Sequence, residues 1–247
     1  NMLVLDNESI ESTRNPIDLW TGQDVIWHSD NEFDYFQAWH RGYERIKGAI
    51  VTRKICFVKP HFWVIHDRVT PQKNCSAKTV SSFLHACNPF VSREGRWVSS
   101  GAKSRLNVVP LSARNSVEIG LDNRMNAARD SMESGFYRNY YPNRYFISFT
   151  RRLRAGVPLD ICVLLYPVQK ADRSRVHVEA IPALQNGRQV QAENAQAWHI
   201  NCGKQRHLIY MNHNEPGPES SVGGYPISAR AAVMNESGKT DRWSSVE

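Results

Sequence analysis

The sequence predicts an all-β fold, a large antiparallel β-sandwich with long loops and little helix. Short runs of strand-forming residues recur at regular intervals, and clusters of Asn, Gly, Pro and Ser separate them. No stretch shows a sustained hydrophobic period of about 3.6 residues, the signature of a long amphipathic helix. The 247 residues are enough to build a large core. We therefore predict a single β-sandwich domain over residues 1–247.

The expected strands cover most of the chain. Val176 and Val178 alternate with His177 and Glu179, as in a half-buried strand, whereas residues 159–165 are almost continuously apolar, as in a strand covered on both faces. The predicted strands are Met2–Leu5, Asp24–His28, Phe33–Trp39, Ala49–Val58, Phe62–Val69, Thr79–His85, Arg96–Ser100, Ser104–Val109, Ser116–Gly120, Tyr145–Leu153, Leu159–Tyr166, Arg175–Ala180, Gln189–Ala192, Ala197–Asn201, His207–Asn212 and Ala229–Met234.

A hairpin is expected at residues 53–70, RKICFVKPHFWVIHDRVT. Pro60 cannot donate to a strand ladder, so the Lys59-Pro60-His61 joint should lie at a strand end. Successive side chains of a strand point to opposite faces, so His66 and Asp67 should not be partners. We expect Asp67 to close the strand before a turn at residues 70–72.

Two stretches interrupt the strand pattern and are expected to be long loops. Residues 121–144 are polar with several tyrosines, and residues 214–228 are rich in Gly, Pro and Ser. Loops of this length tend to be functional or disordered.

The formal net charge of +7 and the isoelectric point of about 9.3 describe a basic protein. Such a charge suits nucleic acid, an acidic polymer or a membrane surface, and it also suits a merely soluble surface. The densest cluster is the run from Arg151 to Arg154, and no basic block of nucleic-acid-arm length occurs. No apolar run is long enough for a membrane span and no signal peptide is visible. Asn1 is not a natural start, so we expect residues upstream.

The cysteine and histidine spacings predict neither a disulfide framework nor a metal site. The five cysteines include no Cys-x-x-Cys pair, and Cys56 and Cys162 lie in apolar runs that suit buried thiols. The nine histidines include no pair with ligand spacing; His61 and His66, for example, straddle a turn. The sequence therefore predicts no metal within this chain.

Other motifs for chemistry are absent or ambiguous. No Gly-x-Ser-x-Gly elbow, P-loop or dinucleotide fingerprint occurs. Asp30, Glu32 and Asp34 alternate and could share one strand face as glycosidase carboxylates, although solvated edge charge is favoured. His85 at a strand end is more often a hydrogen-bonded structural residue than a base. Trp27 lies near a turn, where an aromatic face can stack on a sugar ring, although core packing explains most tryptophans in a sandwich.

Residues 33–70 resemble the β-sandwich domain of the heparinase II/III-like polysaccharide lyases. The matching motifs are Asp34-Tyr35, Gly42-Tyr43, Arg53, Phe57-Val58-Lys59-Pro60, Phe62, Trp63-Val64-Ile65, Asp67-Arg68 and, further on, Phe83-Leu84-His85, Gly135-Phe136-Tyr137 and Leu164-Leu165-Tyr166-Pro167. The start of the chain, residues 1–6, looks like the family's His-Asn-Thr-Leu-Val-Val-Asp strand without its His. Residues 1–170 carry the resemblance, and Val51 stands where members commonly have a histidine.

The resemblance implies a supersandwich-like fold downstream of a helical toroid. Members cleave acidic polysaccharides by β-elimination: a Tyr or His base removes the proton beside the uronate carboxylate, and polar groups stabilise the resulting charge. In the family pattern most of this machinery, and the ligands of a structural zinc, lie upstream of Asn1. We therefore expect this chain to be scaffold and cleft wall, with no catalytic residue and no cofactor of its own.

Proximity to strand ends suggests Asn1, His28, His40 and Tyr43 as substrate contacts, and a stand-alone binding module would bind glycan through Arg151, Arg152 and exposed aromatic residues. The expected partners are an acidic polysaccharide, of glycosaminoglycan or alginate type, and the toroid of the same protein, with no nucleic acid and no membrane span. The family implies a periplasmic or secreted protein. Two alternatives stay open: a stand-alone carbohydrate-binding module, and a structural β domain without a ligand.

Overall fold

The computed structural model describes residues 2–8, 23–112, 115–121, 145–172, 174–213, 219–236 and 243–246, and it confirms an antiparallel all-β sandwich. Among these residues the one α-helix is α1 (Glu44–Lys47). No helix in the described ranges is long and apolar enough to cross a membrane.

The chain divides into two compact units, and the backbone passes from one unit to the other several times. The first unit holds Asn1–Thr21, His40–Thr52 and Asp67–Asp172, and the second holds Gly22–Trp39, Arg53–His66 and Arg173–Glu247. Strands β4 (Ala49–Val58) and β5 (Phe62–Pro71) therefore carry residues of both units. The expectation of a single domain stays a prediction.

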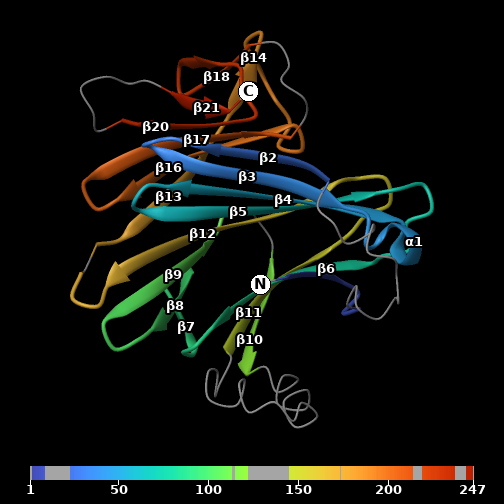
Figure 1. Cartoon of the computed structure of the whole chain (residues 1–247), viewed down its shortest axis with the longest axis horizontal. Helices are drawn as coiled ribbons and strands as arrows, with labels where there is room; N and C mark the ends of the chain where they lie inside the picture. The colour runs from blue at the N-terminus through green and yellow to red at the C-terminus, as the bar shows by residue number, and fades with distance from the viewer. Residues whose placement is uncertain are drawn as a thin grey trace. The chain divides into compact units, whose positions relative to one another are not determined.

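The first unit contains a four-stranded antiparallel sheet with the order β1-β6-β11-β10 (Figure 1). Its inner face is apolar because the pleat places Leu84, Ile147 and Phe149 on one side, and the Phe149 ring meets Trp97 edge-on at 5.6 Å. The strands of this unit are β1 (Met2–Leu5), β6 (Thr79–Ala86), β7 (Phe90–Arg93), β8 (Arg96–Ser100), β9 (Ser104–Pro110), β10 (Ser116–Leu121), β11 (Tyr145–Arg152) and β12 (Leu159–Gln169).

The second unit contains β2 (Gln23–Ser29) and β3 (Phe33–His40), which pair as a hairpin. It also holds a five-stranded sheet, β13-β16-β17-β20-β21, and a four-stranded sheet, β15-β14-β18-β19 (Figure 1). Their bounds are β13 (Val176–Ile181), β14 (Ala183–Gln185), β15 (Arg188–Gln189), β16 (Ala195–Cys202), β17 (Gln205–Asn212), β18 (Ser220–Val222), β19 (Tyr225–Ile227), β20 (Ala231–Asn235) and β21 (Ser244–Val246).

The pleat of β3, β4 and β5 separates a buried face from a half-buried face within the second unit. Phe33 and Tyr35 of β3, Cys56 of β4 and Phe62 of β5 are almost completely buried. Phe62 meets the His207 ring of β17 edge-on, with the centroids 5.3 Å apart. This face therefore packs on the five-stranded sheet, and the side chains between these positions point the other way.

Most of the predicted strands are confirmed within one to three residues at each end. The alternation at Val176–Glu179 and the buried run that begins at Leu159 are also confirmed. The Cys56 and Cys162 thiols are buried and free. The elements that the sequence did not predict are α1, β7, β14, β18, β19 and β21, each of five residues or fewer.

Two expectations are corrected. Residues 214–228 are not a loop throughout, because residues 220–227 form the hairpin β18–β19, whose turn uses the positive φ angles of Gly223 and Gly224. Asp67 does not close its strand: β5 continues to Pro71, and Asp67 is buried and accepts a hydrogen bond from Ser82 Oγ at 2.7 Å. Residues 122–144 of the other predicted loop lie outside the described residues.

Candidate functional site

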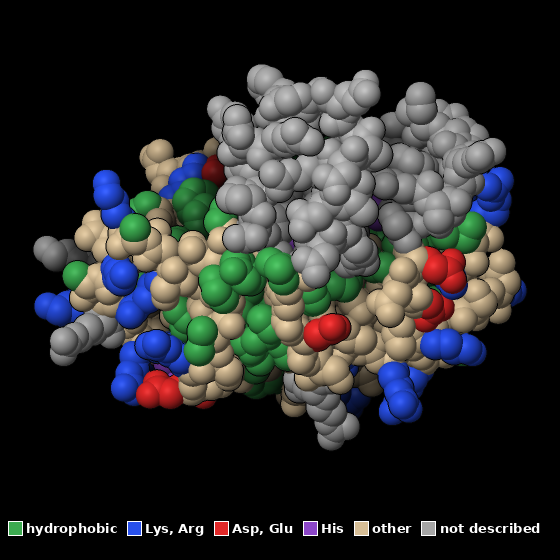
Figure 2. Space-filling model, turned by 90° about the horizontal axis from the view of Figure 1, so that it is seen from below, with side chains coloured by type: hydrophobic (Ala, Val, Ile, Leu, Met, Phe, Trp, Pro, Cys, Tyr) green, Lys and Arg blue, Asp and Glu red, His purple; other side chains and the backbone are tan. Residues whose placement is uncertain are grey.

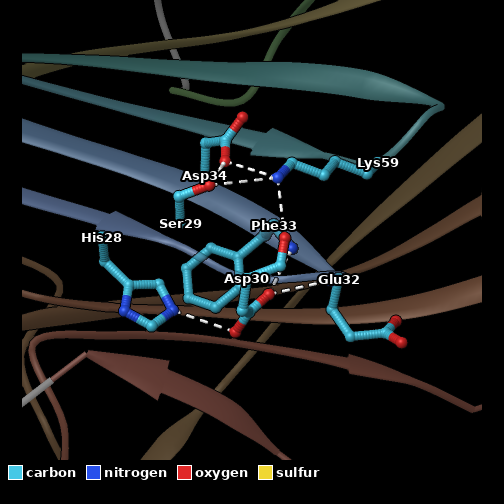
Figure 3. Close-up of polar contacts among 7 residues, drawn as sticks. All are labelled: His28, Ser29, Asp30, Glu32, Phe33, Asp34 and Lys59. Atoms are coloured by element: carbon cyan, nitrogen blue, oxygen red, sulfur yellow. Dashed lines mark hydrogen bonds and ion pairs between the residues drawn. The ribbon is translucent and has the colours of Figure 1, made fainter.

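The turn between β2 and β3 is organised by the Asp30 side chain. Asp30 Oδ1 accepts hydrogen bonds from the backbone N–H groups of Glu32 (2.7 Å) and Phe33 (2.8 Å), as Figure 3 shows. Asp30 Oδ2 lies 2.9 Å from His28 Nε2. An aspartate carboxylate in this position accepts hydrogen bonds from backbone N–H groups that have no strand partner in a tight turn.

Next to this turn, Lys59 is held by three oxygens of the β2–β3 hairpin. Its Nζ lies 2.5 Å from Asp34 Oδ1, and it donates to the backbone oxygen of Asp30 at 2.7 Å and to Ser29 Oγ at 3.3 Å (Figure 3). Ser29 Oγ in turn donates to Asp34 Oδ1 at 2.6 Å. We call Ser29, Asp34 and Lys59 the polar triad. It joins two stretches of the resemblance, Asp34-Tyr35 and Phe57–Pro60.

Both aspartates are held in the ionised form. Burial opposes ionisation of Asp30, but the hydrogen bonds from the Phe33 backbone, His28 and the Glu32 backbone outweigh it and lower its pKa. The hydrogen bonds from Lys59 and then Ser29 lower the pKa of Asp34. A glycosidase acid needs a raised pKa, so this pair does not suit that role. The idea of one shared strand face was also wrong, because Asp30 and Glu32 lie in the turn and only Asp34 lies in β3.

His28, a predicted substrate contact, lies in β2 on the face opposite Trp27. Its ring packs on buried Phe33 with centroids 5.0 Å apart, and its Nε2 is engaged with Asp30. These contacts orient the imidazole. Its side chain keeps 29% exposure, so one part of the ring stays open to solvent.

The other face of β2 and β3 is aromatic and exposed. Trp27 pairs in register with Phe36, and its residue exposure is 66%. Val25, two residues before Trp27, is 58% exposed. Core packing therefore does not account for Trp27. On β4 and β5, Phe57 and Trp63 are half-buried and stack with centroids 4.4 Å apart.

His40 and Tyr43, two other predicted contacts, lie together in the first unit. Their ring centroids are 6.3 Å apart, and His40 Nδ1 accepts a hydrogen bond from the Gly42 N–H at 3.2 Å. Tyr43 is 1% exposed, and its hydroxyl donates to the backbone oxygen of Glu8 at 2.9 Å. Burial raises the pKa of Tyr43 to about 12. This geometry gives Tyr43 a structural task.

The structure describes two of the three remaining predicted contacts, Arg151 and Arg152. Arg151 is in β11, and its Nη1 donates to the backbone oxygen of Asp160 at 2.7 Å, whereas Arg152 ends the strand in an exposed position. Asn1 lies outside the described residues. His85 is half-buried in β6, and its ring lies 6.5 Å from Phe83. Over the visible face of Figure 2, Lys and Arg side chains are scattered and do not form one patch.

The sequence did not predict a cluster of buried basic residues in the second unit. Lys54 is 3% exposed, its Nζ donates to the backbone oxygen of Asn212, and it lies 3.4 Å from His213 Nδ1. The fully buried His66 stacks on His213 with centroids 4.4 Å apart. Only the strand alternation that buries Lys54 could have signalled the cluster.

Comparison with known proteins shows likeness in structure alone. No protein-family model matches the sequence, and no curated protein matches it. Among solved structures, the heparan sulfate lyase HepC from Pedobacter heparinus aligns with a TM-score of 0.60 and 14% identity, over 86% of this chain and 30% of that lyase. A heparinase III aligns with a TM-score of 0.58 and 18% identity, again over 86% and 30%.

The chain thus spans less than a third of the length of the lyases that it matches. At these identities the alignments establish a common fold, and they extend well beyond the 33–70 segment. The resemblance to the heparinase II/III-like lyases is confirmed at that level: this chain has the β-sandwich fold of one part of those polysaccharide lyases.

Proposed function

We propose that this chain is the β-sandwich module of a polysaccharide lyase that cleaves uronate-containing acidic polysaccharides by β-elimination. The observation that carries the proposal is the fold shared with two lyases over 86% of the chain. The net charge of +7 suits a polyanionic substrate. Such an enzyme would meet its substrate in the periplasm or outside the cell.

In this proposal the module is scaffold and one wall of the substrate cleft. The two aspartates of the β2–β3 hairpin have lowered pKa values, and the Tyr43 hydroxyl is buried against a backbone oxygen. None of these groups suits a base that must take a proton from the sugar near neutral pH. The base and the charge-stabilising groups would then come from a helical toroid of the same protein.

A second candidate function is a carbohydrate-binding module that works without a catalytic partner. The exposure of Trp27 favours it, because ligand sites combine an aromatic surface with a few polar groups. This candidate requires glycan binding by the 247-residue chain alone.

The test compares the 247-residue chain with the longer gene product that contains it. Both are incubated with heparan sulfate, heparin and alginate, and the ultraviolet absorbance of the unsaturated uronate ends is followed. We expect absorbance to rise with the longer product and to stay flat with the 247-residue chain. A rise with the shorter chain would contradict the scaffold role. No rise with either, together with glycan binding by the shorter chain, would favour the second candidate.

A further inference from the structure

The exposed face of the β2–β3 hairpin combines an indole platform with polar side chains. Trp27 and Phe36 lie opposite each other in register, and Val25, two residues before Trp27 in β2, is also exposed (58%). Ser29 and Asp34 are the next residues on the same face, two positions from Trp27 and Phe36, and they too are paired in register. The apolar residues and the polar triad therefore form one continuous surface, which we call the hairpin face.

The exposure of Trp27 needs an explanation, and the residues beside it suggest one. A single exposed apolar residue is ordinary on a protein surface, but here the exposed indole lies directly opposite a phenylalanine. Among the described residues β2 pairs only with β3 and so has a free edge, where proteins usually place charge to prevent unwanted contacts. An apolar edge of this kind marks a binding surface.

The polar triad indicates which class of ligand the hairpin face can bind. The Lys59 ammonium and the Asp34 carboxylate compensate each other, and the donors of Lys59 and Ser29 are engaged within the hairpin, so this end of the hairpin face offers carboxylate acceptors with little net charge. Ser29 and Asp34 keep part of their surface in solvent. Acceptors beside a flat apolar ring match a sugar, whose hydroxyls can donate hydrogen bonds around the rim of an apolar ring face.

We propose that the hairpin face binds a pyranose ring of the polysaccharide, with the sugar stacked on Trp27 and its hydroxyls donating hydrogen bonds to the Asp34 carboxylate. The site holds polymer and takes no part in bond cleavage. This inference rests on the proposed function in one respect: the polymer is taken to be the acidic polysaccharide that the lyase cleaves. Binding there would keep the chain on its substrate by raising the local concentration of polymer.

The test measures binding of heparan sulfate and alginate oligosaccharides to the 247-residue chain by isothermal titration calorimetry. The variants are Trp27→Ala, Trp27→Phe and Asp34→Asn, with Leu121→Ala as the matched control, because Leu121 is an exposed apolar residue (43%) on a strand of the first unit. We expect Trp27→Ala to bind at least about tenfold more weakly, as for a truncated aromatic hot spot. Trp27→Phe should keep part of the affinity, Asp34→Asn should lose part, and Leu121→Ala should match the wild type.

Three results would overturn the inference: no binding of either oligosaccharide by the wild-type chain, equal binding by Trp27→Ala, or a dimer in light scattering that Trp27→Ala abolishes. The last result would assign the hairpin face to a second copy of the chain. The lyase assay separates this inference from the proposed function. Uronate release without Trp27-dependent binding would refute the hairpin site alone, whereas Trp27-dependent binding without uronate release would refute the lyase assignment alone.

Discussion

An alanine at Gly48 should destabilise the protein, because the added methyl group would collide with backbone atoms. Gly48 follows α1 with φ +65°, its N–H donates to Glu44 O at 2.9 Å, and its oxygen accepts from the Gln72 N–H at 2.8 Å. A Cβ atom here would lie 2.7 Å from the Asn74 oxygen and 2.8 Å from Cys75 Cα. Both neighbours are backbone, so they cannot rotate away as a side chain would.

The size of the effect follows from two contributions. A left-handed alanine costs about 1–2 kcal/mol, and the stiffer unfolded chain returns about 0.4–1 kcal/mol, which leaves roughly 1 kcal/mol of destabilisation. The collision also displaces the backbone that holds Gln72 N–H on Gly48 O and Ser76 N–H on Lys47 O, each bond worth about 1 kcal/mol. Gly48→Ala should therefore lower the free energy of unfolding by about 3 kcal/mol.

Gly156→Ala is the matched control. Gly156 lies in the same unit with φ +71°, and a Cβ there would meet nothing within 4 Å. It should show the backbone contribution alone, a fall in Tm of about 2–4 °C, against about 6–12 °C for Gly48→Ala. Thermal unfolding followed by circular dichroism measures both. Equal Tm values for the two variants would refute the argument from the close approach of residues 74 and 75.

Three further predictions concern buried and paired groups. Tyr43→Phe should cost about 1–2 kcal/mol of stability, because it leaves the Glu8 carbonyl without its donor; an unchanged urea midpoint would contradict the structural task given to this hydroxyl. Burial, and then the nearby His61, lowers the pKa of His207 to about 4, so the unfolded chain binds the extra proton first as pH falls. The part of the free energy of unfolding that depends on His207 should be fully present above about pH 6.5 and should fall by about 3 kcal/mol between about pH 6.5 and pH 4. A His207→Gln variant that keeps the same pH profile of stability would exclude His207 as the cause. Lys59→Met should raise the pKa of Asp34 in an NMR titration while changing stability by less than about 1 kcal/mol, because the pair is near the surface; an unmoved Asp34 titration would show that Ser29 alone holds it.

The strands could be predicted from the sequence because their signal is local. Alternation along Val176–Glu179 and the run of apolar residues after Leu159 each report a pleated strand without reference to any neighbour. The Lys59-Pro60-His61 joint is local in the same sense, since proline ends a ladder wherever it stands. The short strands β18 and β19 were missed because three residues are too few to show a period, and the Gly223-Gly224 turn that joins them lies within a stretch of loop composition.

The sequence by itself determined the all-β class, most strand positions and the two faces of each long strand, because a two-residue period is written into neighbouring residues. Which of the two faces becomes core was decided only by the tertiary structure, since burial depends on where the second sheet lies. Trp27 and Tyr35 both lie in alternating strands, yet one is 66% exposed and the other is completely buried. Lys59 likewise meets Asp34 only because β2, β3 and β4 lie side by side, a pairing that the spacing of 25 residues does not report.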